Sequence, residues 1–494
     1  MKSDNALLIA WQETLATKGE AVAISDTSGK ILSTFSGIET QARGFERQID
    51  KFDPGSVLAL QIGNHPDWPA LLLACLRRQL VVLPLEQSIG DTERDVALKT
   101  CSAKAFITGS TATTTLSLKR RWSLRPVGKG EGEGGNTPVH ARSFVYEIAN
   151  GPSPDWGENP PSLLKLTSGT TAAPRAIRFR SAQLLADCDQ ICATMGISDA
   201  DLNFGVIPIS HSYGFSNLLT PLIVHGVPIV LSSDRLPRAV LLDLAQTNAT
   251  VFPGTPVLYQ ALGEMENVPA LPKLRLCISA GAPLSGATAK EFFDRFARPI
   301  HSFYGSSECG GICYDRYGKV FEDGFVGAPM KDVDLTMVDP KIEMSQVRVR
   351  SAAVGDGYYP EPDEEKLGGG TFMPDDLLTR CGETFKVVGR VSDVINVAGK
   401  KINPAQIEAQ LLRFAGVREA VAFGRKSSPR NEEVAACVVA DVDVREKDLL
   451  EFCRRNLSTW QVPKQIFIVD AIPSNERGKI SRRELARRFA TSDR

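Results

Sequence analysis

The order of apolar and polar residues in the first part of the chain predicts alternating strands and helices. Residues 57–62 form a short apolar run, residues 68–78 have apolar side chains at helical spacing, and residues 81–85 are apolar again. A short apolar run is typical of a buried strand, and a period near 3.6 residues is typical of a helix. The pattern therefore predicts a βαβ unit.

Further apolar runs extend this arrangement along the chain. Residues 103–108 and 227–231 are predicted as buried strands with helical stretches between them. Strands that alternate with helices favour an α/β fold in which mainly parallel sheets are doubly wound. We therefore predict this architecture for a large N-terminal domain, residues 1–390.

The pattern changes after Gly389 and Arg390. Residues 417–423, 434–439 and 465–469 are predicted as strands, and residues 446–457 as a helix among them. About a hundred residues can hold a core of their own. We therefore predict a small, mobile α+β domain over residues 391–494, with the boundary at residues 391–393.

Composition and charge exclude several classes of protein. The 494 residues are 43% hydrophobic and 23% charged, as in folded globular proteins. The 57 basic residues nearly balance the 58 acidic ones, so we expect no nucleic acid as partner. Apolar runs fall short of the roughly 20 residues that span a bilayer, and the first residues do not resemble a secretory signal. We expect a cytoplasmic protein without a membrane span.

The ten cysteines are scattered and form no CxxC pair, so we expect buried thiols rather than a disulfide framework or a zinc site. Two pairs, Cys188 with Cys192 and Cys309 with Cys313, have a spacing compatible with one face of a helix. Without companion ligands nearby in the sequence, this spacing does not predict a metal site.

The strongest local motif is LLKLTSGTTAAPRAIR, residues 163–178. A buried strand leads into hydroxyl residues and a glycine, a backbone that can fold around phosphate oxyanions, although the Walker A pattern is absent. Such a stretch on its own is more often an ordinary loop. The whole segment, however, resembles the phosphate loop of the adenylate-forming superfamily, which includes acyl-CoA synthetases, peptide-synthetase adenylation domains and luciferases.

This resemblance implies that the loop contacts the phosphates of ATP, with a catalytic role for Thr170. Two alanines, Ala172 and Ala176, replace the family's glycines, and we expect them to reduce loop mobility. An arginine replaces the family's lysine and keeps the positive charge with a different geometry. The implied phosphate contacts are Thr167, Ser168, Gly169, Thr170, Thr171 and Arg175.

A second motif, SFYGSSECG at residues 302–310, resembles the family's YGxTE. The resemblance implies that Tyr304 stacks on adenine beside Gly305, that Ser307 lies near the α-phosphate and that Glu308 holds Mg²⁺. A carboxylate suits Mg²⁺ because it is a hard oxygen ligand. A turn upstream matches the family's adenine-pocket loop through Gly281, Ala282 and Pro283.

The segment FMPDDL, residues 372–377, occupies the place of the family's TGDL, whose aspartate binds the ribose hydroxyls. Asp376 matches this aspartate best, and Asp375 remains a rival. Arg390, in a GRxxDxI motif, is implied to contact ribose and phosphate. The family's hinge residue falls at Ser392, so we expect a working hinge with an altered balance between states.

The last motif, PSNERGKISR at residues 473–482, resembles PxTxxGKIxR. The resemblance implies that Lys479 steadies the substrate carboxylate and the α-phosphate. Gly399, in the segment NVAGKKINPAQI at residues 396–407, is implied by the family's GRxxDxIxxxGxxIxP motif to approach the pantetheine arm. Basic side chains could meet the phosphates of coenzyme A or the acidic face of a carrier protein, or simply form a solvated face. They are Lys400, Lys401, Arg425, Lys426, Arg430 and Arg477.

Residues 208–217, PISHSYGFSN, match the family's acyl-pocket region. His211 and Tyr213 are the implied pocket residues, although a lone histidine is often structural. His211 stands where amino-acid-activating domains carry an aspartate, so an acid without an α-amine is favoured. Phe303 stands where many relatives have a small residue. We therefore predict a short pocket for a small or aromatic acid.

The resemblance is closest to acyl- and aryl-CoA ligases and covers nearly the whole chain. It implies that ATP and Mg²⁺ activate a carboxylic acid as an acyl-adenylate, which then passes to coenzyme A. Two alternatives stay open: a freestanding enzyme that loads the phosphopantetheine of an acyl carrier protein, and a degenerate nucleotide-binding member without turnover.

Overall fold

The computed structural model describes residues 5–109, 112–126, 143–149, 153–167, 175–232, 234–318, 322–397, 400–428, 431–473 and 481–489. The chain divides into two compact units, one formed by Met1–Thr336 and Arg348–Met373 and the other by Met337–Val347 and Pro374–Arg494. Residues 374–390 group with the second unit, upstream of the boundary predicted after residue 390. Among the described helices, none has the length and apolar character needed to cross a membrane.

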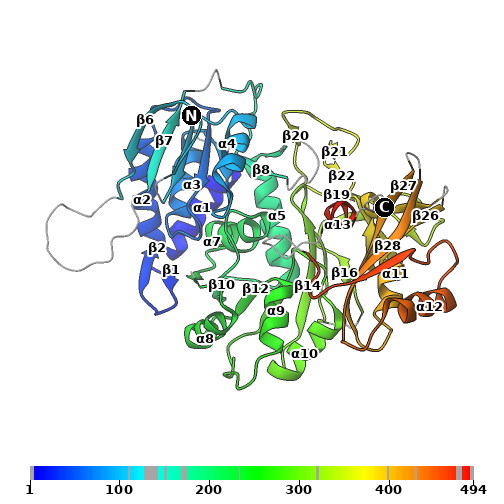
Figure 1. Cartoon of the computed structure of the whole chain (residues 1–494). Helices are drawn as coiled ribbons and strands as arrows, with labels where there is room; N and C mark the ends of the chain where they lie inside the picture. The colour runs from blue at the N-terminus through cyan, green and yellow to red at the C-terminus, as the bar shows by residue number, and fades with distance from the viewer. Residues whose placement is uncertain are drawn as a thin grey trace. The chain divides into compact units, whose positions relative to one another are not determined.

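The larger unit contains an eight-stranded sheet whose centre is parallel (Figure 1). The predicted βαβ unit is confirmed, because the strands at residues 57–61 and 81–84 pair in parallel and are joined by α3 (Trp68–Arg77). Helix α4 (Asp91–Thr100) packs on one face of the sheet through Ala97 and Leu98. The strand order is β20 (Gly357–Tyr359), β9 (Ala176–Phe179), β8 (Leu163–Leu166), β4 (Val81–Pro84), β3 (Val57–Gln61), β5 (Ala105–Thr108), β7 (Phe144–Ile148), β6 (Leu118–Ser123).

A second sheet of the larger unit is parallel from β14 to β1 and antiparallel at its two ends. One face is covered by α8 (Pro237–Thr247), α9 (Pro256–Gly263) and α10 (Gly286–Phe296), whose apolar side chains form one core with the strands. The strand order is β16 (Phe325–Pro329), β15 (Gly310–Tyr314), β14 (Ile300–Ser306), β13 (Leu276–Ser279), β12 (Val251–Gly254), β10 (Asn203–Gly205), β11 (Ile229–Leu231), β1 (Val22–Asp26), β2 (Ile31–Thr34).

A bundle of helices accompanies these sheets. Helix α1 (Ala6–Lys18) packs against α5 (Ser181–Met195) and α7 (Thr220–His225), and α2 (Phe35–Gln48) packs against α3. Every residue of α3 from Trp68 to Leu76 is buried, which is typical of a helix covered on all sides. Between α6 (Ser212–Gly214) and α7, residues Phe215–Leu219 form a π-helical turn, η1.

A four-stranded sheet, β17 (Asp334–Met337), β19 (Val347–Arg350), β22 (Thr371–Phe372) and β21 (Leu367–Gly368), completes the larger unit. The second unit begins with strands β18 (Met344–Ser345), β23 (Asp376–Cys381) and β24 (Thr384–Arg390). A 3₁₀ turn, η2 (Val391–Asp393), then leads to the hairpin of β25 (Ile395–Val397) and β26 (Lys400–Ile402).

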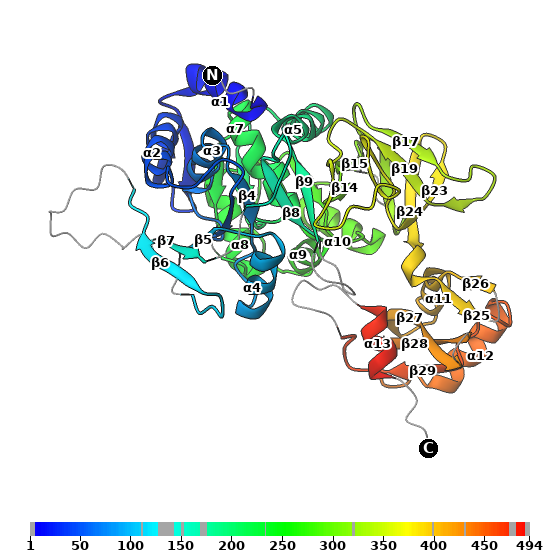
Figure 2. The ribbon, with the colours of Figure 1, turned by 90° about the horizontal axis from the view of Figure 1, so that it is seen from above.

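The rest of the second unit is a three-stranded sheet of β27 (Val417–Ser428), β28 (Asn431–Ala440) and β29 (Gln465–Ile468). One face packs on α11 (Pro404–Leu411) and α12 (Glu446–Asn456), and the other on α13 (Arg482–Arg488) (Figure 2). The alternating side chains of one strand serve both cores, since Ala422 faces the first and Phe423 the second. The predicted α/β fold with a small α+β unit is confirmed.

Candidate active site

The turn of the β14–β15 hairpin carries the predicted nucleotide motif. Two glycines allow this turn: a Cβ on Gly305 would lie 2.6 Å from the carbonyl oxygen of Gly310. Gly310 has φ +70°, and its Cβ would lie 2.0 Å from Oδ1 of Asp187. The strands pair Tyr304 with Cys313, which leaves Ser307 and Glu308 at the tip. The local backbone therefore fixes where these two side chains stand.

The carboxylate of Glu308 is held from both sides. The hydroxyl of Ser306 donates to Oε2, and the phenol of Tyr358 donates to Oε1 at 3.1 Å. Burial, together with the nearby Glu308 charge, raises the pKa of Tyr358, so the phenol keeps the proton that it donates. A carboxylate offers about four lone-pair positions. Positions beyond the two used here fit a hard cation such as Mg²⁺.

Arg175 connects the phosphate-loop segment to this carboxylate. Its guanidinium carbon lies 4.2 Å from the ring centroid of Tyr358, and Nη1 lies 3.9 Å from the carboxylate of Asp363. The backbone N–H and hydroxyl of Thr167 both donate to the carbonyl of Arg175, at 2.8 and 3.2 Å. The ends of the loop are thereby held together. Ser168, Gly169, Thr170, Thr171 and Ala172 lie outside the described residues.

Ala176, one of the two alanines that replace glycines, begins β9 and pairs with Leu166. Any residue adopts this extended conformation, so the predicted loss of loop freedom does not arise at this position.

The predicted adenine loop follows the neighbouring strand. In the parallel pair of β13 and β14, Ser279 lies opposite Ser302, so the loop of Gly281, Ala282 and Pro283 leaves the same sheet edge as Tyr304. Gly281 has φ +90°, a conformation that favours glycine. Ligands of open α/β sheets bind at the carboxyl ends of the strands. The three loop residues are exposed there.

The predicted acyl-pocket residues meet the hairpin through two contacts. The ring of Tyr213 lies 5.9 Å from that of Phe303, and the hydroxyl of Ser212 donates to that of Ser307 at 2.9 Å. The Tyr213 phenol also donates to the carbonyl of Ile278 at 3.0 Å, so this side chain is buried and fixed. Nδ1 of His211 accepts from the N–H of Tyr213 at 3.2 Å, which gives the imidazole a capping role at α6.

Buried polar residues lie behind the hairpin. Asp187 of α5 accepts from the N–H of Gly311 at 3.1 Å and from the hydroxyl of Ser216 at 2.6 Å. Lys165 of β8 is buried, with its ammonium 4.7 Å from the ring centroid of Phe179. Burial lowers the pKa of Lys165, although the charge of Asp187 opposes that shift. These side chains connect the hairpin to α5 and to the strand that leads into the phosphate loop.

In the second unit, the predicted ribose contacts form an ion pair. Asp376 opens β23 and pairs with Arg390 at the end of β24, with Nε of Arg390 2.8 Å from Oδ1 of Asp376. The neighbouring Asp375 is exposed, and its carbonyl accepts from the N–H of Val391. The geometry thus joins Asp376 to the predicted arginine.

Arg482 is a further organising residue of the second unit. Its guanidinium donates to Asp393 at 2.6 Å, to Glu408 at 2.8 Å and to the carbonyl of Ala422 at 3.0 Å. This anchors α13 beside the turn that holds Ser392. Lys479 and Gly399 lie outside the described residues, and the side chain of Lys401 is likewise not described.

Two of the basic side chains considered for coenzyme A have partners inside the second unit. Arg425 is buried and donates to Glu433 and Gln465. Its burial removes it from the surface groups that can meet a phosphate. The ammonium of Lys400 lies 3.3 Å from the ring centroid of Trp460.

Sequence reasoning missed Tyr358, Ser212, Lys165, Asp187 and Arg482. Tyr358 lies 50 residues from Glu308 in the chain, so spacing gave no signal for the contact. A lysine inside an apolar strand is itself a signal, because lysine is rarely buried without a reason.

Three comparisons with known proteins agree with this arrangement. The family model described as AMP-binding enzyme matches residues 11–359, and the one described as AMP-binding enzyme C-terminal domain matches residues 406–479. A feruloyl-CoA synthase of Amycolatopsis sp is 28% identical over 454 residues, covering 88% of this chain and 89% of that protein. An oxalate–CoA ligase of Arabidopsis thaliana is 26% identical over 470 residues, again covering 88% and 89%. The crystal structure of ATP-bound MatB from Rhodopseudomonas palustris has a TM-score of 0.82 at 20% identity and covers 98% of both chains.

Proposed function

The chain belongs to the AMP-binding enzyme family, and we propose that it activates a carboxylic acid with ATP and passes the acyl group to coenzyme A. The predicted resemblance to adenylate-forming enzymes is thereby confirmed. The observation that carries the proposal is the connected set of Arg175, Tyr358 and Glu308, which combines a cation for phosphate oxygens with a carboxylate for a metal ion. The relatives named as CoA ligases favour coenzyme A over the carrier-protein and degenerate alternatives.

The first half-reaction joins two anions. A carboxylate oxygen of the acid attacks the α-phosphorus of ATP, the bond to the β-phosphate breaks, and pyrophosphate leaves. Mg²⁺ bound by Glu308 would neutralise phosphate charge. Arg175 and Thr167 stand at the two ends of the loop. The guanidinium of Arg175 is proposed to hold phosphate oxygens, and the hydroxyl of Thr167 would do so on leaving the carbonyl of Arg175, to which it donates here. Gly281, Ala282, Pro283 and Tyr304 are the proposed adenine contacts, and Asp376 and Arg390 the proposed ribose contacts.

The second half-reaction attacks the acyl-adenylate, a mixed anhydride. The thiol sulfur bonds to the acyl carbon, AMP leaves with the electron pair, and the thiol proton passes to solvent or buffer. Lys479 is proposed to stabilise charge in the first step only, because a thiol needs access to the acyl carbon in the second. Gly399 is proposed to line the path of the pantetheine arm, with Lys401 near the phosphates.

The acid is proposed to be small or aromatic and to lack an α-amine. Phe303 is buried between the ring of Tyr213 and the backbone at Gly311, where an added Cβ would lie 2.9 Å from the Phe303 ring. A large side chain fixed in this way shortens the space on its side of the pocket. His211 offers no carboxylate to pair with an ammonium group. The two relatives are named for different acids, so the pocket residues carry this part of the proposal.

A panel of acids tests the proposal directly. The purified protein is incubated with ATP, Mg²⁺ and one acid at a time, with and without coenzyme A, and pyrophosphate, AMP and acyl-CoA are measured. We expect acid-dependent pyrophosphate with a small or aromatic acid, and acyl-CoA when coenzyme A is present. ATP binding without pyrophosphate release across the panel would favour the degenerate alternative. Transfer to a phosphopantetheinylated carrier but not to coenzyme A would favour the carrier alternative, and a strong preference for long-chain acids would contradict the short pocket.

The role of Lys479 is tested by separating the half-reactions. In Lys479→Ala, pyrophosphate exchange should fall by about 10²–10³ because a charge that stabilises the transition state is lost. Thiolation of preformed acyl-adenylate should stay near the wild-type rate. Equal loss in both half-reactions would contradict this division. Lys464→Ala, a lysine elsewhere in the second unit, is the control.

A further inference from the structure

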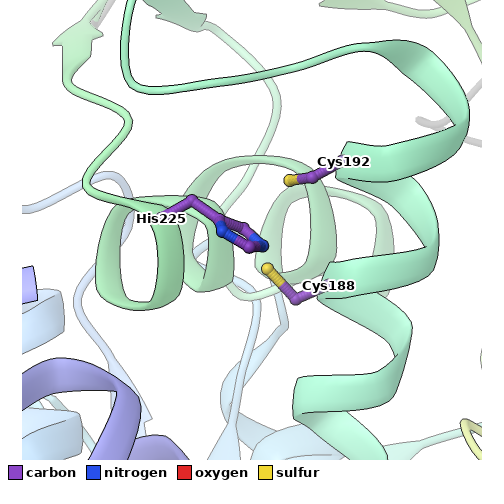
Figure 3. Close-up of side chains that lie close together, drawn as sticks. All are labelled: Cys188, Cys192 and His225. Atoms are coloured by element: carbon purple, nitrogen blue, oxygen red, sulfur yellow. The ribbon is translucent and has the colours of Figure 1, made fainter. Parts of the chain in front are cut away.

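Three potential metal ligands of the larger unit converge away from the hairpin. Cys188 and Cys192 lie one turn apart on α5, and His225 is the last residue of α7. Their two sulfur atoms and one ring nitrogen all lie within 4.8 Å of one another. Figure 3 shows the three side chains pointing toward a common space, with a ring nitrogen of His225 close to the sulfur of Cys188. The histidine supplies the companion ligand that the sequence spacing did not reveal.

One ring nitrogen of His225 lacks a well-directed hydrogen bond. Nε2 of His225 is buried and has no hydrogen-bond partner among the described residues. A carboxylate oxygen of Asp189 lies 3.0 Å away but outside the direction in which an N–H would donate, so proximity does not satisfy this atom. Both thiols are buried, while the His225 side chain is 35% exposed. The cluster can therefore be reached from the histidine side.

We propose that Cys188, Cys192 and His225 bind a zinc ion that fastens α5 to α7. Two thiolates and a neutral imidazole balance the charge of Zn²⁺, and this set of sulfur and nitrogen donors suits zinc. Asp189, whose carboxylate lies 3.0 Å from Nε2 of His225, is the proposed fourth ligand, or the residue that binds a water in that position.

The distances are compatible with such a site after small side-chain movements. Zinc bonds of about 2.0–2.3 Å place the ligand atoms of a tetrahedral site about 3.3–3.8 Å apart. The ligand atoms, which lie within 4.8 Å of one another, reach this geometry when side-chain rotation moves them about 1 Å closer together. Thiolates are the form of cysteine that binds zinc, so zinc binding displaces the thiol protons.

The proposed zinc is structural, because Cys188 and Cys192 on α5 and His225 on α7 belong to none of the motifs assigned to the reaction. Its consequence for the active site passes through α5, where Asp187 precedes Cys188 and holds the backbone N–H of Gly311. Fastening this helix would support the hairpin that carries Glu308.

Cobalt substitution tests the proposal. The reduced, metal-stripped full-length protein is titrated with Co²⁺, and we expect one equivalent to produce a sulfur-to-cobalt charge-transfer band with the visible bands of a tetrahedral site. Zn²⁺ should abolish these bands. Cys188→Ala with Cys192→Ala should remove the charge-transfer band, while Cys75→Ala, a buried helical thiol of α3, should keep it. The thiolate band separates this site from metal bound at the nucleotide motif.

His225→Gln is a second test in case the double cysteine variant fails to fold. Its side chain is partly exposed, so we expect its replacement to leave the core intact. We expect it to weaken Co²⁺ binding at least tenfold and to remove the increase in melting temperature that Zn²⁺ gives the wild type. A wild-type protein without a thiolate band, an unchanged band in the double variant, or a disulfide between Cys188 and Cys192 in the purified protein would each overturn the proposal.

Discussion

Two regions with predicted nucleotide contacts differ in how their side chains are held. At the hairpin of the larger unit, Glu308 is half-buried and receives hydrogen bonds from Ser306 and Tyr358. In the second unit, Asp376 is paired with Arg390, whose side chain is 47% exposed. The first carboxylate is positioned by donors that can remain when a metal binds. The second is occupied by the cation that is itself predicted to bind the nucleotide.

Glu308 is therefore pre-organised for its ligand, whereas at Asp376 the nucleotide must compete with Arg390. A carboxylate whose neighbours already fix it loses little freedom on binding, so its interactions are available in the transition state. An ion pair whose arginine is about half exposed contributes little to stability, and ribose hydroxyls can replace that arginine at small cost. We therefore expect changes at the hairpin to act on the rate of adenylation, and changes at the ion pair to act on ATP binding.

The largest effect is expected for Glu308→Gln, which keeps the shape but loses the charge. Pyrophosphate exchange at saturating ATP should fall by about 10²–10³ because the metal loses its protein ligand. Glu291→Gln, on the exposed surface of α10, is the matched control. A variant that keeps the wild-type rate at every Mg²⁺ concentration would show that Glu308 does not act on the rate of adenylation.

Asp376→Asn should act on binding. Hydrogen bonds to a charged group contribute about 1.5–3 kcal/mol, so the KM for ATP should rise at least tenfold while kcat changes little. Asp375→Asn is the internal control, because this neighbour is exposed and should leave KM unchanged. If Asp375→Asn raised KM instead, the ribose contact would belong to the rival residue.

Lys165→Met examines the buried charge behind the hairpin. Burial lowers the pKa of Lys165 below the usual 10.5, so above its folded pKa the unfolded chain binds a proton that the folded chain has released. Between the folded pKa and pH 10.5, the free energy of unfolding of the wild type should therefore rise with pH relative to that of the variant. The expected slope is up to about 1.4 kcal/mol per pH unit. Denaturant unfolding at a series of pH values measures the difference, with the exposed Lys290→Met as control. Parallel profiles for wild type and Lys165→Met would show that the folded state does not perturb this lysine.

The smallest effect is expected for Tyr358→Phe. The ring that stacks under Arg175 remains, and one hydrogen bond to Glu308 is lost. This bond contributes about 0.5–1.5 kcal/mol, so the Mg²⁺ concentration for half-maximal adenylation should rise a few-fold. Tyr359→Phe, the adjacent phenol that faces Trp156, is the control. A loss as large as that of Glu308→Gln would mean that Tyr358 touches the substrate itself.

Local pattern predicted the parts of the fold that depend on local physics. The strand, helix and strand around α3 were predicted within a few residues, because apolar runs and helical spacing are properties of neighbouring positions. The antiparallel additions at the sheet ends were not predicted. They depend on pairings such as that of β9 with β20, whose residues lie about 180 positions apart.

The site residues likewise divide into those indicated by a local motif and those whose contacts form only in the folded chain. Glu308 and Arg175 were predicted because they stand inside contiguous motifs. Tyr358 and His225 were not, because each meets its partner only after the chain folds back. Arg482 is the last residue of the PSNERGKISR motif, yet its partners Asp393 and Glu408 come from distant segments.

The π-helical turn at Phe215–Leu219 bears on how specificity is compared among relatives. Such a turn holds one residue more than an α-helical turn, so every side chain after it is rotated by about 100° relative to an uninterrupted helix. A position-by-position transfer of acyl-pocket residues from a relative without this extra residue would assign the wrong side of the helix from residue 215 onward. Transferring acid preference between such enzymes therefore requires exchange of residues 208–225 as a block rather than substitution of single residues.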